Sequence, residues 1–337
     1  EKCFFTGISK YGKISVFSAL NNLTDISLQQ KYATMCGATQ EELIEYFDEH
    51  LKDLPDKFNL TKEYLLKTIK AHYNGFSFDA ETSVYNLYSL LQFFIIKEFK
   101  NFWFDTGTSE MLIELLKEQN ILVDELEGTE MEYGMLDLAD NMHQNVVSLL
   151  FQTGYLTLKK AFREYEDLYF KLGFPNIEVK QAFSRHLMVQ YTQKSVDRIS
   201  TNIALPLRKA MRNKDFEKIF EILKKSVYGC VPYEIFDRKE AYFHTIFHLT
   251  FNMIGFRCES QVQNNIGRID TIVETELYIY IFEFKVDTKK DNFALEQIKN
   301  NQYANKYFAL EKEIFAFGIN FSSEKRNIEN WFFEQLK

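Results

Sequence analysis

The hydrophobic pattern is clearest in the last third of the chain, where helical and alternating periods follow one another. Apolar residues recur at helical spacing over 237–253 and again over 292–308. Runs rich in β-branched and aromatic residues predict strands at 257–263, 269–273, 277–286 and 314–320. The predicted order is therefore helix, three strands, helix, strand, and the tail from Asn327 offers one more element.

The first two thirds of the chain are predicted to be mainly helical, with one β-hairpin. Thr39 and Thr61 stand in N-cap positions. The expected helices cover 41–52, 61–73, 88–99, 110–119, 178–191, 196–211 and 215–226. Alternation on both sides of a short polar link predicts a hairpin over 154–174. Helices on both sides of this hairpin suggest a winged-helix-like module, so the fold class is α/β with segregated α+β parts.

Composition then narrows the class of protein. Hydrophobic residues make up 46% of the 337 residues, and 33 Phe and 19 Tyr supply enough apolar surface for a core, which excludes a disordered chain. Apolar stretches stay far below the roughly 20 residues of a spanning helix, so no membrane association is expected. Four cysteines without a C-x-x-C pair predict reduced thiols and a cytoplasmic location. Because the chain begins at Glu1 rather than Met, we expect a further segment upstream.

Charge is unevenly distributed along the chain, whose net charge is −8. The first 200 residues hold 20 basic and 29 acidic side chains, whereas residues 201–337 hold 20 and 19. Long-range attraction to nucleic acid is therefore not predicted for the chain as a whole. The near-neutral second part still allows it, because catalytic carboxylates lower the formal charge of a nuclease.

A segment near the start of the chain resembles the sequence motif of a phosphate-binding loop. Residues 7–13 follow a predicted strand and fit G-x-x-x-x-G-K, but the next residue is Ile14 instead of the Ser or Thr that places a hydroxyl on Mg²⁺. Ser15 comes one position late. We therefore interpret the segment as a turn at a strand end, and we expect no ATPase activity from this chain alone.

Three charged residues interrupt the apolar strands of the last third. Asp270 lies in one predicted strand and Glu283 in the next, joined by a polar turn at 274–276. Glu283 and Lys285 are two residues apart and leave the same face of their strand. Whether Asp270 joins that face depends on the hairpin register, which the sequence leaves open.

Charges in so apolar a strand need partners, because burying an unpaired charge is costly. A divalent cation is one such partner: Mg²⁺ prefers one or two carboxylates together with water and substrate phosphate. The alternative is a solvent-facing Glu283–Lys285 pair on an exposed edge strand, which is common for an isolated E-x-K. Asp270 at hairpin distance and the surrounding order of elements favour the metal site.

A zinc site is a further alternative on the predicted helix 237–253. Glu240, His244 and His248 share one face at a spacing of four residues. Zinc-binding H-E-x-x-H helices carry a Glu directly after the first His, where this chain has Thr245. We therefore expect partly buried histidines beside the face that carries Glu283 and Lys285.

With these motifs in place, residues 237–321 resemble the PD-(D/E)XK nuclease superfamily, whose core is αβββαβ, as in restriction endonucleases. The sequence GRID at 267–270 matches the aspartate of that superfamily, and IFEFK at 281–285 matches its E-x-K. The whole chain resembles prokaryotic proteins in which an AAA-ATPase-like domain precedes such a nuclease domain. The segments that carry this second resemblance are TGISKYGKISVFSALNNLTDIS (6–27), YNGFSF (73–78), FWFDTGT (102–108), LLFQTGYLTL (149–158) and LGFPNIEV (172–179).

The first resemblance implies a set of site residues and a metal. Asp270, Glu283 and the Phe284 carbonyl correspond to ligands of Mg²⁺ or Mn²⁺, and Lys285 to the catalytic lysine. Members often add an acid on the first helix and a Gln on the helix after E-x-K. Glu240 and Gln297 fit these positions, although a favourable first-turn acid and an exposed polar residue would explain them equally well.

Together these expectations give three parts: 1–205 as the end of an AAA-ATPase-like region, 206–236 as a helical connector and 237–337 as the nuclease-like domain. The predicted function is metal-dependent phosphodiester hydrolysis with nucleic acid as partner, and ATP would bind only through the region upstream. The alternative function is an inactive nuclease-fold binding module with the ATPase part as a regulatory switch. A homo-oligomer or a protein partner stays open.

Overall fold

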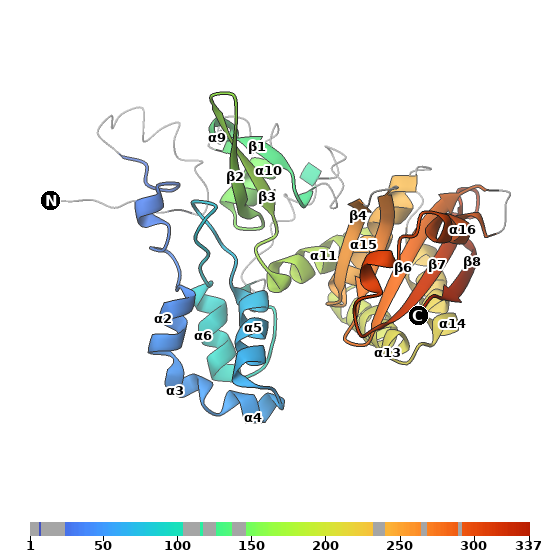
Figure 1. The fold of residues 1–337 in the computed structure, drawn as a ribbon, viewed down its shortest axis with the longest axis horizontal. Helices are drawn as coiled ribbons and strands as arrows, with labels where there is room; N and C mark the ends of the chain where they lie inside the picture. The colour runs from blue at the N-terminus through green and yellow to red at the C-terminus, as the bar shows by residue number, and fades with distance from the viewer. Residues whose placement is uncertain are drawn as a thin grey trace. The chain divides into compact units, whose positions relative to one another are not determined.

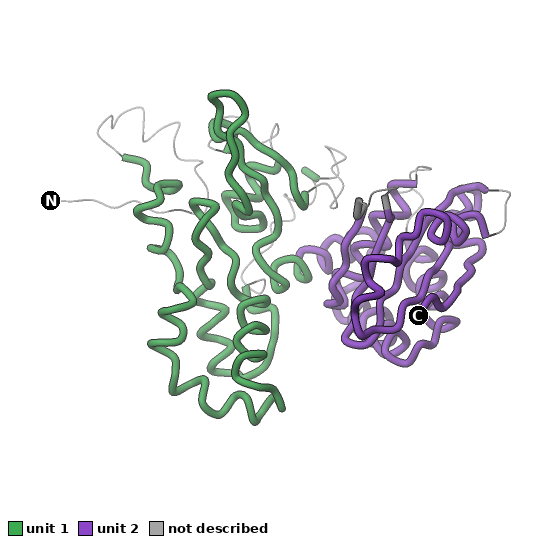
Figure 2. The backbone as a smooth tube through the Cα atoms, viewed as in Figure 1, with its two compact units in different colours: residues 1–182 green, residues 183–337 purple. Residues whose placement is uncertain are grey.

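The computed structural model describes residues 7, 24–103, 115–116, 126–136, 146–231, 240–263, 268–288 and 292–337. The phosphate-loop-like segment and most of the helix predicted at 110–119 lie outside these residues. The chain divides into two compact units, residues 1–182 and 183–337 (Figure 2). The division into three parts at 205 and 236 stays a prediction.

The first unit contains a group of short helices around an aromatic core. They are α2 (Gln40–Tyr46), α3 (Asp48–Leu51), α4 (Leu54–Phe58), α5 (Lys62–Tyr73) and α6 (Leu87–Ile96). Thr39 and Glu42 form a capping box, with the Glu42 N–H donating to Thr39 Oγ1 at 3.2 Å. The Tyr64 N–H donates to Thr61 Oγ1. Both predicted N-caps are thus present, and the helix predicted at 41–52 is divided into α2 and α3 at Phe47.

The predicted hairpin is present and belongs to a three-stranded sheet. Strands β2 (Thr157–Glu164) and β3 (Asp167–Gly173) pair antiparallel, and β1 (Glu130–Glu132) pairs with the other edge of β3. The sequence prediction missed β1, which has only three residues. Helices α9 (Tyr133–Leu136) and α10 (Val146–Gln152) precede the hairpin, and α11 (Ile177–Thr192) follows it.

Two of the segments that resemble the ATPase-like family meet at the start of α11. Asn176 caps this helix by accepting from the Val179 N–H at 3.0 Å, and its Nδ2 donates to the Asn74 carbonyl at 2.9 Å. Gly75 has a φ of +102°, and a Cβ there would lie 2.0 Å from the Pro175 oxygen. These motif residues therefore hold the loop after α5 against the N-terminus of α11.

The second unit is built on one five-stranded sheet in the order β4-β5-β6-β7-β8 (Figure 1). Only β6 and β7 are parallel; the other neighbours are antiparallel. The strands are β4 (Arg257–Gln263), β5 (Arg268–Glu274), β6 (Tyr278–Val286), β7 (Glu313–Ser322) and β8 (Asn327–Gln335). The helices are the end of α11, α12 (Val196–Ile199), α13 (Leu205–Arg212), α14 (Phe216–Ile222), α15 (Glu240–Met253) and α16 (Phe293–Asn300).

Helices cover both faces of this sheet. One face is aromatic: the rings of Phe282 and Phe247 of α15 lie 4.8 Å apart, and Phe216 of α14 lies 5.1 Å from Phe317. The other face is aliphatic, and there Ile281 of β6 packs in one cluster with residues of α16. The alternation predicted for the β6 sequence therefore separates two cores.

The predicted order helix, three strands, helix, strand is observed, with differences at the ends. The helix predicted at 292–308 ends at Asn300, and a short 3-10 turn at Asn305–Tyr307 follows. The tail from Asn327 forms β8, which completes the sheet. Segments 200–204 and 223–227 continue α12 and α14 as π-helical turns, so the two predicted helices over 196–211 and 215–226 are present.

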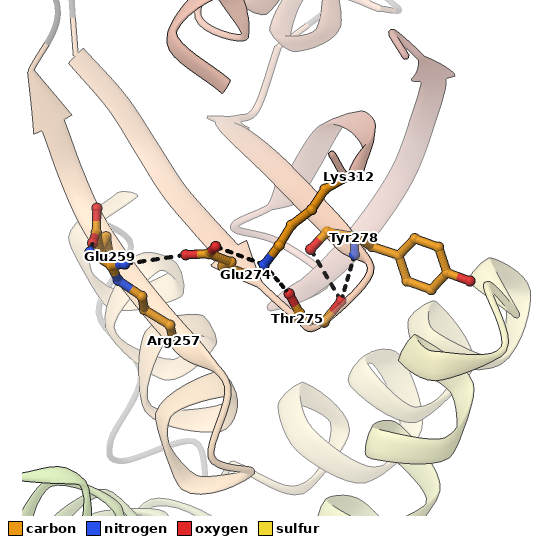
Figure 3. Close-up of polar contacts among 6 residues, drawn as sticks. All are labelled: Arg257, Glu259, Glu274, Thr275, Tyr278 and Lys312. Carbon is orange, nitrogen blue, oxygen red and sulfur yellow. Dashed lines mark hydrogen bonds and ion pairs between the residues drawn. The ribbon is translucent and has the colours of Figure 1, made fainter. Parts of the chain in front are cut away.

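The polar turn between β5 and β6 is also as predicted, and Figure 3 shows its contacts. Thr275 closes the turn, because its Oγ1 accepts from the Tyr278 N–H at 2.9 Å and its N–H donates to the Tyr278 carbonyl at 2.8 Å. Lys312 donates to Glu274 at 2.8 Å and to the Thr275 carbonyl. Across the sheet, Arg257 pairs with Glu274. The turn therefore holds the β5–β6 register from the end opposite to Glu283.

None of the helices formed by the described residues is both long enough and apolar enough to span a membrane.

Candidate active site

The β5–β6 register brings Asp270 to Glu283. Thr271 pairs with Phe282 in an antiparallel ladder, so the next step of the ladder sets Asp270 opposite Glu283. The Phe284 N–H donates to Asp270 Oδ2 at 2.8 Å, which extends the contact past the last strand pair. Residues opposite each other in a ladder share a face. The register that the sequence left open therefore places both carboxylates on one face.

Glu283 and Lys285 lie on a central strand, not on an edge. Glu283 is 1% exposed, and the side chain of Lys285 is 21% exposed. The Lys285 Nζ lies 3.2 Å from Glu283 Oε1 and donates to the Phe284 carbonyl at 2.8 Å. One ammonium thus contacts two of the oxygens that the superfamily resemblance assigns to a metal. The alternative of a solvent-facing pair on an edge strand is wrong.

Helix α16 brings Gln297 to the same carboxylate. The Gln297 Nε2 donates to Glu283 Oε1 and lies 3.5 Å from the Tyr303 hydroxyl, which accepts from Asn301 Nδ2 at 2.9 Å. The close approach of α16 depends on Gly318 of β7, the register partner of Glu283. A Cβ at Gly318 would lie 2.5 Å from the backbone nitrogen of residue 295.

Burial changes the acidity of two carboxyl groups in this site. Desolvation, followed by the charge of Asp270, raises the pKa of Glu283 to about 7, although Lys285 opposes the shift. Glu240, at the start of α15, has part of its side chain in solvent. Desolvation of its carboxyl nevertheless raises its pKa; the positive charge of Lys285 lowers it and the negative charge of Asp270 raises it. Glu240 therefore shares the electrostatic environment of Asp270 and Lys285.

The histidines of α15 support the sheet. His244 Nε2 donates to the Asp270 carbonyl at 2.7 Å and lies 3.2 Å from Thr271 Oγ1. His248 Nδ1 lies 3.4 Å from the Cys258 sulfur. Both histidines are buried, at 6% and 2% exposure. Within the described ranges no group of three or more His, Cys, Asp or Glu side chains could hold a metal ion, so the zinc alternative gains no support.

A hard divalent cation fits the donors that are present. Glu283 Oε2 is buried and has no hydrogen-bond partner, which costs free energy unless another group meets it. The charge of Asp270 acts on the Glu283 carboxyl, and the Phe284 carbonyl contacts the same Lys285 ammonium as Glu283, so two further oxygen ligands lie in this environment. Mg²⁺ commonly uses one or two carboxylates and completes its shell with water. Two carboxylates and one carbonyl are therefore sufficient for such an ion, without a third acidic side chain.

Sequence reasoning missed two residues that shape this site, Tyr303 and Gly318. Tyr303 lies after the end of α16 at Asn300, and its hydroxyl contacts Gln297. The sequence predicts a longer helix that contains Tyr303 and therefore does not predict this contact. The sequence also predicts a buried His244 beside the site but no role for it, and the structure shows that it donates to the backbone carbonyl of Asp270. Gly318 gave a usable signal, because a lone glycine inside an apolar strand marks close approach of another backbone.

The comparisons with known proteins support a nuclease-type domain. Residues 238–331 match the model of the PD-(D/E)XK nuclease superfamily, so this part of the chain carries a domain of that kind. The chain is 31% identical over 339 aligned residues to a protein of Azotobacter chroococcum mcd 1, described as an "Uncharacterized protein in vnfD 5'region". The match covers 98% of this chain and 63% of that relative's length. No solved structure matches the chain.

Proposed function

We propose that residues 237–337 form a nuclease domain that hydrolyses phosphodiester bonds with Mg²⁺ or Mn²⁺, and that nucleic acid is its substrate. One observation carries the proposal: Asp270, Glu283 and Lys285 meet on one face of the sheet, around a buried carboxylate oxygen without a partner. The superfamily match of residues 238–331 supports the same chemistry.

In this proposal Asp270, Glu283 and the Phe284 carbonyl hold the cation. When bound there, the cation lowers the pKa of a water molecule and neutralises charge on the phosphate. Lys285 lies within reach of both Glu283 and the Phe284 carbonyl, so it can orient that water or stabilise charge on the reacting phosphate. Gln297 fixes the orientation of the Glu283 carboxylate, and Glu240 adds negative charge near the cation.

The direct test is cleavage of labelled DNA and RNA with Mg²⁺ or Mn²⁺ by the wild type and by Asp270→Asn, Glu283→Gln and Lys285→Met. We expect each substitution to lower the cleavage rate by about 10²–10⁴-fold. Lys299→Met is the matched control, since Lys299 lies on the exposed side of α16 and pairs only with Glu334 among the described residues. Cleavage that persists in all three site variants would refute the assignment.

Calorimetric titration with Mn²⁺ separates this proposal from an inactive binding module of the same fold. The nuclease proposal expects binding by the wild type and its loss in Glu283→Gln. A folded wild type that does not bind Mn²⁺ would favour the binding module, with the first unit as a regulatory part.

Coupling to an AAA-like ATPase, with ATP bound upstream, and a cytoplasmic location are further parts of the proposal. The ATPase part rests on the resemblance of five segments between residues 6 and 179 to that family. ATP hydrolysis by the complete natural protein, together with a G-x-x-x-x-G-K-[ST] motif before Glu1, is the expected result. A complete protein that neither binds nor hydrolyses ATP would contradict it.

A further inference from the structure

Beyond the proposed catalytic residues, a row of polar side chains crosses the sheet. In the parallel pair β6–β7, Lys285 is the register partner of Asn320. In the antiparallel pair β7–β8, Asn320 is the register partner of Asn330. Register partners point to the same face. Lys285, Asn320 and Asn330 therefore form one row, which we call the polar row, on the face that carries Glu283.

Asn320 is a polar residue in an otherwise apolar part of β7. From Ile314 to Phe321, β7 is apolar apart from this residue, and Asn320 is 4% exposed. The Asn320 amide atoms are not among the fully buried side-chain atoms that lack a partner in the described part of the chain, so the amide keeps some contact with solvent. No hydrogen bond joins the Asn320 side chain to another residue in the described part of the chain. Packing therefore does not explain why this position carries an amide.

The polar row continues from the site toward the surface. The Lys285 side chain is partly exposed at 21%, and Asn330 is exposed. The neighbouring row, which holds Glu283 and Gly318, is covered by the first turn of α16. Two strand spacings separate β6 from β8, about 10 Å in total. That distance corresponds to about three nucleotide steps of a stacked strand.

We propose that the polar row binds the sugar-phosphate backbone of the nucleic-acid substrate on one side of the bond that is cut. Amide side chains commonly contact phosphate and sugar oxygens and position the substrate without reading its sequence. Lys285 provides the charged contact next to the reacting phosphate, and Asn320 and Asn330 provide neutral ones farther along the strand. This inference rests on the proposed nuclease function and adds a substrate-binding surface to it.

The test is binding of a fluorescein-labelled DNA duplex of about two helical turns, with EDTA present to prevent cleavage. Asn330→Ala and Asn320→Ala are each expected to weaken binding about three- to tenfold. Their salt dependence should equal that of the wild type, because an amide releases no counterion, whereas Lys285→Met should reduce the salt slope by about 0.9. Asn213→Ala, an exposed asparagine after α13, is the matched control.

Cleavage kinetics separate this proposal from a structural role of the amides. Asn330→Ala should raise KM and leave kcat unchanged, since Asn330 is exposed and is not one of the proposed catalytic residues. Wild-type affinity and KM in both asparagine variants, alongside normal cleavage by the wild type, would overturn the polar-row assignment alone. A wild type that neither binds the duplex nor cleaves labelled DNA or RNA would instead refute the underlying nuclease function.

Discussion

Glu283 makes the domain's stability depend on pH in a way that can be measured without substrate. Burial raises its pKa from the ordinary value of 4.5 to about 7 in the folded protein. An acid with a raised folded-state pKa stabilises the fold fully below its unfolded pKa, and this contribution is lost as the pH rises through the folded value. We therefore expect the metal-free protein to lose stability between about pH 4.5 and about pH 7.

The size of this loss follows from the two pKa values. The interval from 4.5 to about 7, at about 1.4 kcal/mol for each pH unit, gives an upper limit of about 3 kcal/mol. The charges of Asp270 and Lys285 act on the pKa of Glu283 in opposite directions, so we expect about 1–3 kcal/mol. Glu283→Gln removes the ionisation and keeps an oxygen for Gln297. This variant should be more stable than the wild type at about pH 8 by that amount and nearly equal at about pH 5.

The assay is urea unfolding in EDTA at the two pH values. The chain has two tryptophans, Trp103 in the first unit and Trp331 in the second, where it stacks on Phe220 at 4.2 Å. In a Trp103→Phe background, fluorescence therefore reports the second unit. In a parallel series without EDTA, Mn²⁺ at about 100 times its Kd should stabilise the wild type by about 2.7 kcal/mol and leave Glu283→Gln unchanged. A variant that is no more stable than the wild type at high pH would refute the argument from burial.

Three further substitutions test the packing around the site and the first unit. Gly318→Ala should destabilise the second unit by about 1–3 kcal/mol in urea unfolding, because the added methyl meets the backbone of α16. Gly75→Ala should destabilise the first unit by at least about 1–3 kcal/mol, since its φ is +102° and Pro175 leaves no space, with nuclease cleavage retained. Tyr303→Phe should keep the fold and lower the cleavage rate about three- to tenfold, because Gln297 loses a contact at 3.5 Å.

Gly134→Ala is the control for both glycine substitutions. Its added Cβ meets only the end of a flexible glutamate side chain, at 3.7 Å. Equal midpoints for Gly318→Ala and Gly134→Ala would contradict the steric argument. An unchanged cleavage rate in Tyr303→Phe would show that Gln297 holds its position without the hydroxyl.

The elements of the second unit were predictable because their periods are strong. The alternation in β6 separates Ile281 and Glu283 from Phe282 and Phe284, and the structure buries the two sets against different helices. The capped helices after Thr39 and Thr61 were equally clear, since each cap satisfies a free N–H at a fixed spacing.

What escaped prediction depends on contacts between distant residues. The pairing of Asp270 with Glu283 required the strand register, because a slip by one residue would have turned the aspartate to the aromatic face. The end of α16 at Asn300 is not marked by Gly or Pro, so periodicity alone extended the helix to residue 308. The parallel contact of β6 with β7, which creates the polar row, joins residues that are far apart in sequence.

The crossover between the two parallel strands has a consequence for synthesis. Gln297 lies on the connection between β6 and β7, and β7 lies near the C-terminal end of the chain. Long-range pairings form only after both partners exist, so β6 keeps one unpaired edge until β7 has left the ribosome. We expect the site around Glu283 and Gln297 to assemble only after β7 has been synthesised.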